Sequence, residues 1–335
     1  MRYIFALMMW LCPALAQAQD WEDQNAFGPA SASSTLRVLS STDTSLFAPV
    51  IEDFLQSRSG VAVEYFVTGT AQIDEVFRAA PEDFDVVISS AMDLQLKLVN
   101  DGFSVQIANL DQPDWAQWRN SLFAFTTEPA TIVINRAAFA PESVPQTRQE
   151  LIAAMRARPE VFRGKVGTYD VRDSGLGYLF ATQDARASET FWRLMEVMGG
   201  LDAQLYCCSG AMIDDLVAGE LMVAYNVLGS YVAAREDVAD MLEIVLPLDF
   251  PTIMMRTAFV SSRTEVAEEA AAFVRHLVEM QTGQQSLEAF PLPPLSATTD
   301  STGQAVISLE PALMTYLDPL KRRTFIKEWS SAVIQ

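Results

Sequence analysis

Short apolar runs of strand length alternate with amphipathic stretches of helix length, and this alternation constrains the fold more than any other feature of the sequence. The first predicted strands are at 35–39, 61–67 and 84–88, and a predicted helix follows each of them. Strands that alternate with helices form mostly parallel sheets that helices cover. The sequence therefore predicts the α/β class.

The same alternation returns after a looser segment that contains Pro141 and Pro145. The predicted strands of this second part are at 165–169, 204–208, 222–227, 242–246 and 257–261. The roughly 300 residues from the first strand onward fit two lobes of ordinary domain size. Half of all residues are hydrophobic, so a sizeable core is available.

The N-terminus has the pattern of a secretory signal. Arg2 supplies a positive start, Ile4–Leu11 an apolar run, and Ala16–Ala18 a small-x-small cleavage site. The apolar run is too short to span a membrane, which takes about 18 apolar residues. We expect cleavage after Ala18, export of the remaining chain, and a flexible leader over 19–34 before the first strand.

The charge balance limits the class of partner. The chain has 23 Lys and Arg residues against 43 Asp and Glu residues, a formal net charge of −20. Neutralising phosphates requires a basic surface, so nucleic acid is not expected as a partner. An anionic ligand is still compatible with this balance, because a single arginine in a pocket can bind an anion on an acidic background.

Two adjacent cysteines, Cys207 and Cys208, remain after the predicted cleavage. In an oxidising compartment they form either a vicinal disulfide or two separate thiols. Adjacent residues on a strand point to opposite faces, which argues against the bond. The sequence leaves both states open.

Hydroxyl side chains follow each of the first three predicted strands. They form three groups, at 40–42, at 68 and 70, and at 89–90. The carboxyl ends of parallel strands lie at one edge of a sheet, where ligands bind in open α/β folds. A turn or a helix cap accounts for any single group. Three groups on one edge favour a small polar pocket.

The segment 164–184 contains a turn that suits an anion. Asp173 or Ser174 can cap a helix that begins near Gly175, and the glycine lets a ligand approach the backbone. Arg172 and the free N–H groups of the first helical turn attract negative charge. The alternative is an ordinary turn between a strand and a helix.

Together these features resemble the bacterial periplasmic solute-binding proteins of ABC importers. The resemblance covers nearly the whole mature chain and is carried by the signal, Ser-Ser-Thr-Asp-Thr at 40–44, the segment 164–184, Leu-Tyr-Cys-Cys at 205–208 and Tyr-Asn-Val-Leu-Gly-Ser-Tyr at 225–231. More closely, the chain is similar to the extracellular solute-binding branch with ferric-iron, thiamine and phosphoglycerate-related members. Within that branch it resembles a subgroup associated with tricarboxylate-type two-component sensors.

The resemblance implies the two-lobed type II fold of these proteins, with the ligand in a cleft between the lobes. The first lobe would comprise 35–128 and 255–335, including the C-terminal helices, and the second lobe 129–254. The lobes would close around the ligand by a hinge motion. We accordingly expect a periplasmic monomer whose closed form is recognised by an ABC permease.

The resemblance also implies ligand-binding residues in both lobes. The first lobe would offer Ser41, Thr42, Thr70 and Ser90, and the second Tyr169, Arg172, Ser174, Gly175, Tyr178, Asn226, Ser230 and Tyr231. Arg172 is expected to pair with a carboxylate or phosphate. The predicted ligand is a small anionic organic solute, a di- or tricarboxylate or a phosphorylated acid. No cofactor, metal or catalytic residue is expected.

Three alternatives accompany this reading. Iron-binding members usually present two adjacent tyrosines, whereas Tyr225 and Tyr231 are separated here, so ferric iron is the weaker ligand. A protein of the same fold could instead present its ligand to a membrane sensor kinase. Catalysis is not expected, because the sole histidine, His276, lies on a predicted helix at 265–279 far from the candidate turns.

Overall fold

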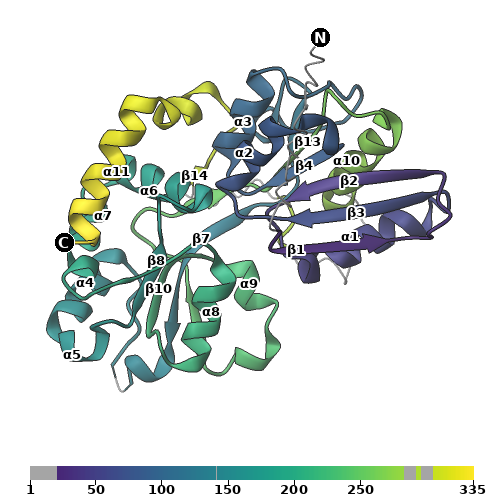
Figure 1. Cartoon of the computed structure of the whole chain (residues 1–335). Helices are drawn as coiled ribbons and strands as arrows, with labels where there is room; N and C mark the ends of the chain where they lie inside the picture. The colour runs from purple at the N-terminus through teal and green to yellow at the C-terminus, as the bar shows by residue number, and fades with distance from the viewer. Residues whose placement is uncertain (1–20, 141, 283–291, 296–304) are drawn as a thin grey trace, which may run out of the picture.

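Two sheets, each flanked by helices, organise the chain into two lobes (Figure 1). The computed structural model describes residues 21–140, 142–282, 292–295 and 305–335. The predicted signal sequence, 1–18, lies outside the described residues. Within them, no helix has both the length and the apolar character needed to cross a membrane. The predicted α/β class and two-lobed fold are confirmed.

The first lobe contains a seven-stranded sheet in the order β1-β3-β2-β4-β13-β6-β5. Its strands are β1 (Asp23–Phe27), β2 (Ser34–Ser40), β3 (Val61–Val67), β4 (Val86–Ser89), β5 (Gln117–Trp118), β6 (Leu122–Ala124) and β13 (Thr257–Val260). As predicted, β2, β3 and β4 are parallel. The strands β1, β13, β6 and β5 pair antiparallel, so the sheet is mixed.

Helices cover both faces of this sheet. They are α1 (Thr44–Gln56), α2 (Gln72–Ala79), α3 (Met92–Asn100) and α10 (Ala267–Thr282). Pro49 lies inside α1 and removes a helical hydrogen bond, which costs about 3 kcal/mol. Phe47, Val50, Ile51 and Phe54 of the same helix are buried, and each contributes about 1.5–3 kcal/mol. Burial of this apolar stripe therefore outweighs the proline.

The expected flexible leader contains a strand instead. In β1, Asp23 lies opposite Val67 and Phe27 opposite Val63 of β3, in antiparallel register. Just before β1, Trp21 packs against Phe66 with ring centroids 5.1 Å apart. Most side chains of β1 are exposed, so its sequence is polar and has the composition of a linker. The free edge of β3 supplies the hydrogen bonds that order it.

The second lobe is built on the strand order β14-β12-β7-β10-β8-β9, with β11 also paired to β7. Its strands are β7 (Glu128–Asn135), β8 (Val166–Tyr169), β9 (Gln204–Tyr206), β10 (Val223–Leu228), β11 (Leu242–Val245), β12 (Thr252–Met254) and β14 (Ala305–Val306). Its helices are α4 (Arg148–Ala157), α5 (Pro159–Phe162), α6 (Gly175–Ala187), α7 (Thr190–Gly199), α8 (Ser209–Ala218) and α9 (Gly229–Ala233).

The chain passes between the two sheets at two neighbouring places. It leaves the first sheet after β6 and enters the second at β7, and it returns between β12 and β13. The connecting residues are 125–127 and 255–256. These crossing segments place the residues around 126 and 256 between the lobes.

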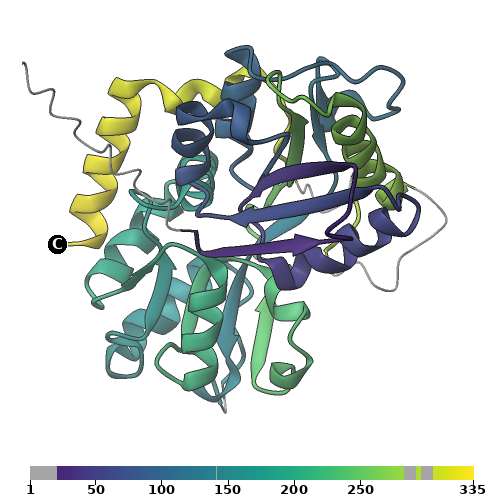
Figure 2. The same cartoon turned by 45° about the vertical axis from the view of Figure 1, so that its right-hand side comes forward.

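The C-terminal helix α11 (Pro319–Val333) packs on the second lobe, whereas the sequence analysis assigned it to the first. Phe325, Trp329 and Val333, four residues apart, are buried in one apolar cluster with α7. Gly199 at the end of α7 permits the contact, because a Cβ there would lie 2.2 Å from the carbonyl oxygen of Ala332. Figures 1 and 2 both show the yellow α11 running down to the second lobe.

Candidate functional site

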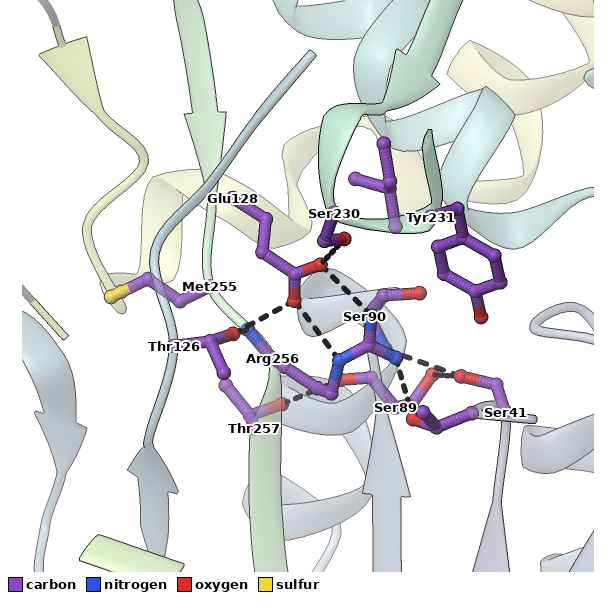
Figure 3. Close-up of polar contacts among 12 residues, drawn as sticks. Ser41, Ser89, Ser90, Thr126, Glu128, Ser230, Tyr231, Met255, Arg256 and Thr257 are labelled. Carbon is purple, nitrogen blue, oxygen red and sulfur yellow. Dashed lines mark hydrogen bonds and ion pairs between the residues drawn. The ribbon is translucent and has the colours of Figure 1, made fainter. Parts of the chain in front are cut away.

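An ion pair between Arg256 and Glu128 lies where the two crossing segments meet. Both side chains are fully buried. Nε and Nη2 of the guanidinium donate to the two carboxylate oxygens at 3.0 and 3.1 Å (Figure 3). This bidentate geometry is the strongest form of such a pair. It compensates two charges that would be costly to bury singly.

The pair connects the two lobes. On the first-lobe side, Nη1 of Arg256 donates to the hydroxyl of Thr42 at 2.5 Å. On the second-lobe side, the hydroxyl of Ser230 in α9 donates to Glu128 at 2.6 Å. Thr126, in the first crossing segment, donates to the other carboxylate oxygen at 2.9 Å. A change in the relative position of the lobes therefore acts directly on this network.

Two guanidinium hydrogens of Arg256 are left over. Arginine has five N–H donors, and the contacts to Glu128 and Thr42 use three of them. Among the described residues, the remaining N–H on each terminal nitrogen has no hydrogen-bond partner. Buried donors normally have one. This site can therefore donate two charge-assisted hydrogen bonds to a further group.

The hydroxyls at the ends of β2 and β4 meet at one edge of the sheet, as their strand positions predicted, and they lie near Arg256 (Figure 3). Ser41 donates to Ser89 at 3.3 Å and accepts from the backbone N–H of Ser90 at 3.3 Å. Ser90 is buried, and its own hydroxyl has no partner among the described residues. In Figure 3 this hydroxyl points toward the side of the cluster where Tyr231 lies.

Tyr231 and Asp43 face each other from opposite lobes. The tyrosine hydroxyl lies 3.5 Å from the Asp43 carboxylate, which precedes α1 and makes no capping hydrogen bond to it. Asp43 is solvent-exposed, yet partial desolvation of its carboxylate raises its pKa, although Arg256 and Tyr231 act in the opposite direction. Both residues line a cavity of about 500 Å³ that Ser45 of the first lobe and Gly210 of the second also line.

The turn before α6 meets the first lobe. Ser174 caps the helix by accepting from the N–H of Gly177 at 3.1 Å, as predicted. Thr70 accepts from the N–H of Leu176 at 3.1 Å. A Cβ at Gly175 would lie 2.9 Å from the carbonyl oxygen of Thr70, so only glycine fits this close approach. The first helical turn thus contacts protein groups of the other lobe.

Tyr169 is buried near this region, and its hydroxyl lies 2.5 Å from the hydroxyl of Ser209 at the start of α8. Burial raises the pKa of Tyr169. Ser209 also accepts from the N–H of Leu228 at 3.3 Å. The tyrosine therefore has a structural partner within the second lobe.

Three other predicted ligand residues contact groups outside the Arg256 cluster. Arg172 is 46 % exposed and forms an ion pair with Asp170 in its own turn. Tyr178 donates to the carbonyl of Tyr316 at 2.6 Å, beneath the C-terminal helix. Asn226 donates to Asp184 at 2.9 Å. As ligand residues these three stay predictions.

Comparison with known proteins identifies solved structures of the same fold. No protein-family model matches the chain, and no curated protein matches it by sequence. Among solved structures, the substrate-binding protein of the ABC transporter from Agrobacterium tumefaciens is similar over 93% of this chain and 98% of its own, with 29% identity and a TM-score of 0.84. The chain therefore has the two-lobed fold of the substrate-binding proteins of ABC transporters and is similar to one of them over nearly its whole length.

More distant periplasmic binding proteins share the fold. AfuA from Actinobacillus pleuropneumoniae, solved with fructose-6-phosphate, is 14% identical over 90% of this chain and 99% of its own, with a TM-score of 0.72. Iron-bound HitA from Pseudomonas aeruginosa is 13% identical over 89% of this chain and 99% of its own, with a TM-score of 0.66. Proteins of this one fold therefore hold chemically different ligands.

The sequence did not identify the charged pair at the crossing segments, which is central to this candidate site. Arg256 and Glu128 were not among its candidates. A usable signal was present, because Arg256 carries a charge in the otherwise uncharged and mostly apolar segment from Ile253 to Val260. An arginine inside such a segment is either paired or functional, since unpaired arginines are almost never fully buried.

The adjacent cysteines of this binding protein precede α8. Both are exposed free thiols in the structure, with their sulfur atoms 2.8 Å apart. Although Cys208 is exposed as a residue, partial desolvation of its sulfur and the neighbouring Cys207 raise its pKa to about 12. The thiolate that would act as a nucleophile is therefore scarce at neutral pH.

Proposed function

We propose that this protein is the substrate-binding component of an ABC importer and captures a small anionic organic solute in the periplasm. The solute is a di- or tricarboxylate or a phosphorylated acid. One observation carries the proposal: Arg256 lies between the lobes with two N–H donors to spare, next to the hydroxyl of Ser90. A carboxylate or phosphate oxygen accepts such donors.

The ligand residues of this proposal are Arg256, Ser41, Ser90 and Tyr231. Ser41 and Ser90 follow β2 and β4, and Ser90 precedes α3. The N-terminus of α3 adds a favourable potential for negative charge. Because Arg256 is hydrogen-bonded to Thr42 of one lobe and, through Glu128, to Ser230 of the other, a ligand bound to it stabilises one arrangement of the lobes.

Binding without catalysis fits the placement of the sole histidine. His276 lies on α10, where its Nε2 is 3.4 Å from Asp53 and its ring packs against Phe54 of α1. These contacts join α10 to α1, and burial lowers the pKa of the histidine. Among the described residues, none of its contacts reaches the Arg256 cluster.

Ferric iron is the second candidate, favoured by the similarity to HitA and by the proximity of Tyr231 to Asp43. It needs further oxygen ligands. Tyr225, the other tyrosine considered, is buried and hydrogen-bonded to Arg148 and Asp184. Among the described residues, no group of three or more His, Cys, Asp and Glu side chains could hold a metal ion. The anion proposal is therefore the stronger one.

Thermal unfolding of residues 19–335 tests the proposal. The ligands to screen are citrate, malate, phosphate esters, thiamine and ferric citrate. A ligand at 100 times its Kd stabilises the protein by about 2.7 kcal/mol, which raises Tm by several degrees. A shift with a metal-free carboxylate or phosphate ester supports the anion proposal. A shift with iron alone, accompanied by tyrosinate colour, contradicts it.

Removal of the Ser90 hydroxyl tests whether the ligand binds next to Arg256. Ser90→Ala should weaken the ligand found in this screen about tenfold, because it removes one hydrogen bond to a charged group. The ligand-free Tm should change little, since the Ser90 hydroxyl has no partner among the described residues. Ser331→Ala is the matched control, because its hydroxyl donates to a backbone carbonyl on exposed α11. Equal affinities of the two variants would exclude Ser90 from the site.

A further inference from the structure

We propose that the ligand of this cleft carries a cationic group in addition to its anionic group, and that Asp43 binds the cation. This inference rests on the proposed function, because it takes Arg256 as the partner of the anionic group. It identifies the ligand class as a zwitterion, such as an amino acid with an acidic side chain or an aminoalkyl phosphate. It also makes Asp43 the residue that determines specificity.

Three arginines around the cleft already have carboxylate partners. Arg256 is neutralised by Glu128 at 3.0 Å. Arg235, on the wall of the cavity, lies 2.9 Å from Asp237 and 3.1 Å from Asp214. The ion pair of Arg172 with Asp170 was described above. None of these three arginines therefore brings an uncompensated positive charge to the ligand.

Asp43 differs from these carboxylates, because no cation pairs with it among the described residues. A residue at this position normally turns its side chain back to the N–H groups of the helix it precedes, but Asp43 makes no such bond. Its side chain instead approaches Tyr231 across the cleft at 3.5 Å, the outer limit of a hydrogen bond. Its acceptor capacity is therefore largely unused.

One short segment of the second lobe connects the two charges. The hydroxyl of Tyr231 lies 3.5 Å from the Asp43 carboxylate, and the adjacent Ser230 donates to Glu128, the partner of Arg256, at 2.6 Å. The adjoining cavity of about 500 Å³ is in the range of small-molecule sites. A ligand with its carboxylate or phosphate on Arg256 and its ammonium on Asp43 would contact both lobes through Tyr231.

Titration calorimetry with matched ligand pairs tests the inference. Each pair differs only in an ammonium group against a hydroxyl: aspartate and malate, glutamate and 2-hydroxyglutarate, phosphoethanolamine and 2-hydroxyethyl phosphate. The wild-type protein should bind the ammonium member of at least one pair about tenfold to a hundredfold more tightly, the value of a hydrogen bond to a charged group. Asp43→Asn should abolish this preference.

The control is Asp53→Asn, which removes a carboxylate from within α1, where it lies 3.4 Å from His276 of α10. It should keep the wild-type preference. Wild-type protein that binds malate, citrate or another anion without preferring any ammonium partner overturns the zwitterion inference and leaves the proposed function standing. An undiminished preference in Asp43→Asn also overturns it. Absence of binding to every anion and every zwitterion contradicts both proposals.

Discussion

Among the described residues two arginines, Arg148 and Arg256, are fully buried, and they differ in how completely their donors are used. Arg148 donates from Nε to Tyr225 at 2.6 Å, from Nη1 to Asp249 at 3.1 Å and to the carbonyl of Phe250 at 3.2 Å, and from Nη2 to Asp184 at 3.4 Å. Four of its five N–H groups are thus engaged. Arg256 engages three.

The surroundings of the two arginines also differ. Arg148 lies within one lobe, shares its charge with the carboxylates of Asp184 and Asp249, and stacks on the ring of Phe250 at 3.9 Å. Arg256 has one carboxylate partner and lies between the lobes. Burial of an arginine therefore does not by itself indicate a binding site. Unused donors between the two lobes do.

The largest effect that this comparison predicts is on stability. Arg148→Met should lower the free energy of unfolding by about 3–5 kcal/mol, because it leaves the buried carboxylate of Asp184 without a cation. Urea unfolding followed by circular dichroism measures the change. Arg163→Met is the matched control: this exposed arginine pairs with Asp202, and the loss should be under about 1 kcal/mol. Equal losses in the two variants would contradict a structural role for Arg148.

The next effect is on affinity. Arg256→Met combined with Glu128→Gln should weaken the ligand identified by the thermal screen about a hundredfold, because it removes two charge-assisted hydrogen bonds. The double variant should be more stable than Arg256→Met alone, since no uncompensated carboxylate remains. Calorimetric titration gives the affinity and urea unfolding the stability. Wild-type affinity in the double variant would make Arg256 as structural as Arg148.

Much of the fold was predictable because it depends on local sequence. The strand expected at 61–67 is β3 (Val61–Val67), whose buried and half-buried residues alternate. Helix α6 begins at Gly175, as its cap residue predicted. The strand β1 was missed because its neighbour β3 orders it, although its own residues are mostly exposed. The position of α11 depends on a contact with α7, which no local pattern encodes.

Some residues of the candidate site were likewise predictable from local sequence, and others were not. Ser41 and Ser90 follow predicted strands, so their meeting at one sheet edge could be inferred. The pairing of Glu128 with Arg256 spans 128 positions of the chain, and no spacing rule connects residues so far apart. The turn at Arg172 has the residues of an anion site, but its arginine pairs with Asp170 two residues away. Local patterns cannot show which charges are already compensated.

The smallest expected effect is at the turn that contains Arg172. It tests whether an arginine that is already paired contributes to ligand binding. Arg172→Ala should change the free energy of unfolding by about 0–1 kcal/mol, the usual value of a partly exposed ion pair. Ligand affinity should change little, because the ligand proposed here binds Arg256. Both are measured on the protein used for the Arg256 variants, with Asp170→Asn as the control for loss of the pair.

The opposite result would be equally informative. The sequence analysis placed the anion at Arg172, and a severe loss of affinity in Arg172→Ala with normal affinity in Asp170→Asn would support that placement. Arg172 would then have to leave Asp170 when the ligand binds, which the lowered pKa of Asp170 makes costly. In that case the spare donors of Arg256 would not mark the ligand, and its role would be to hold the crossing segments together.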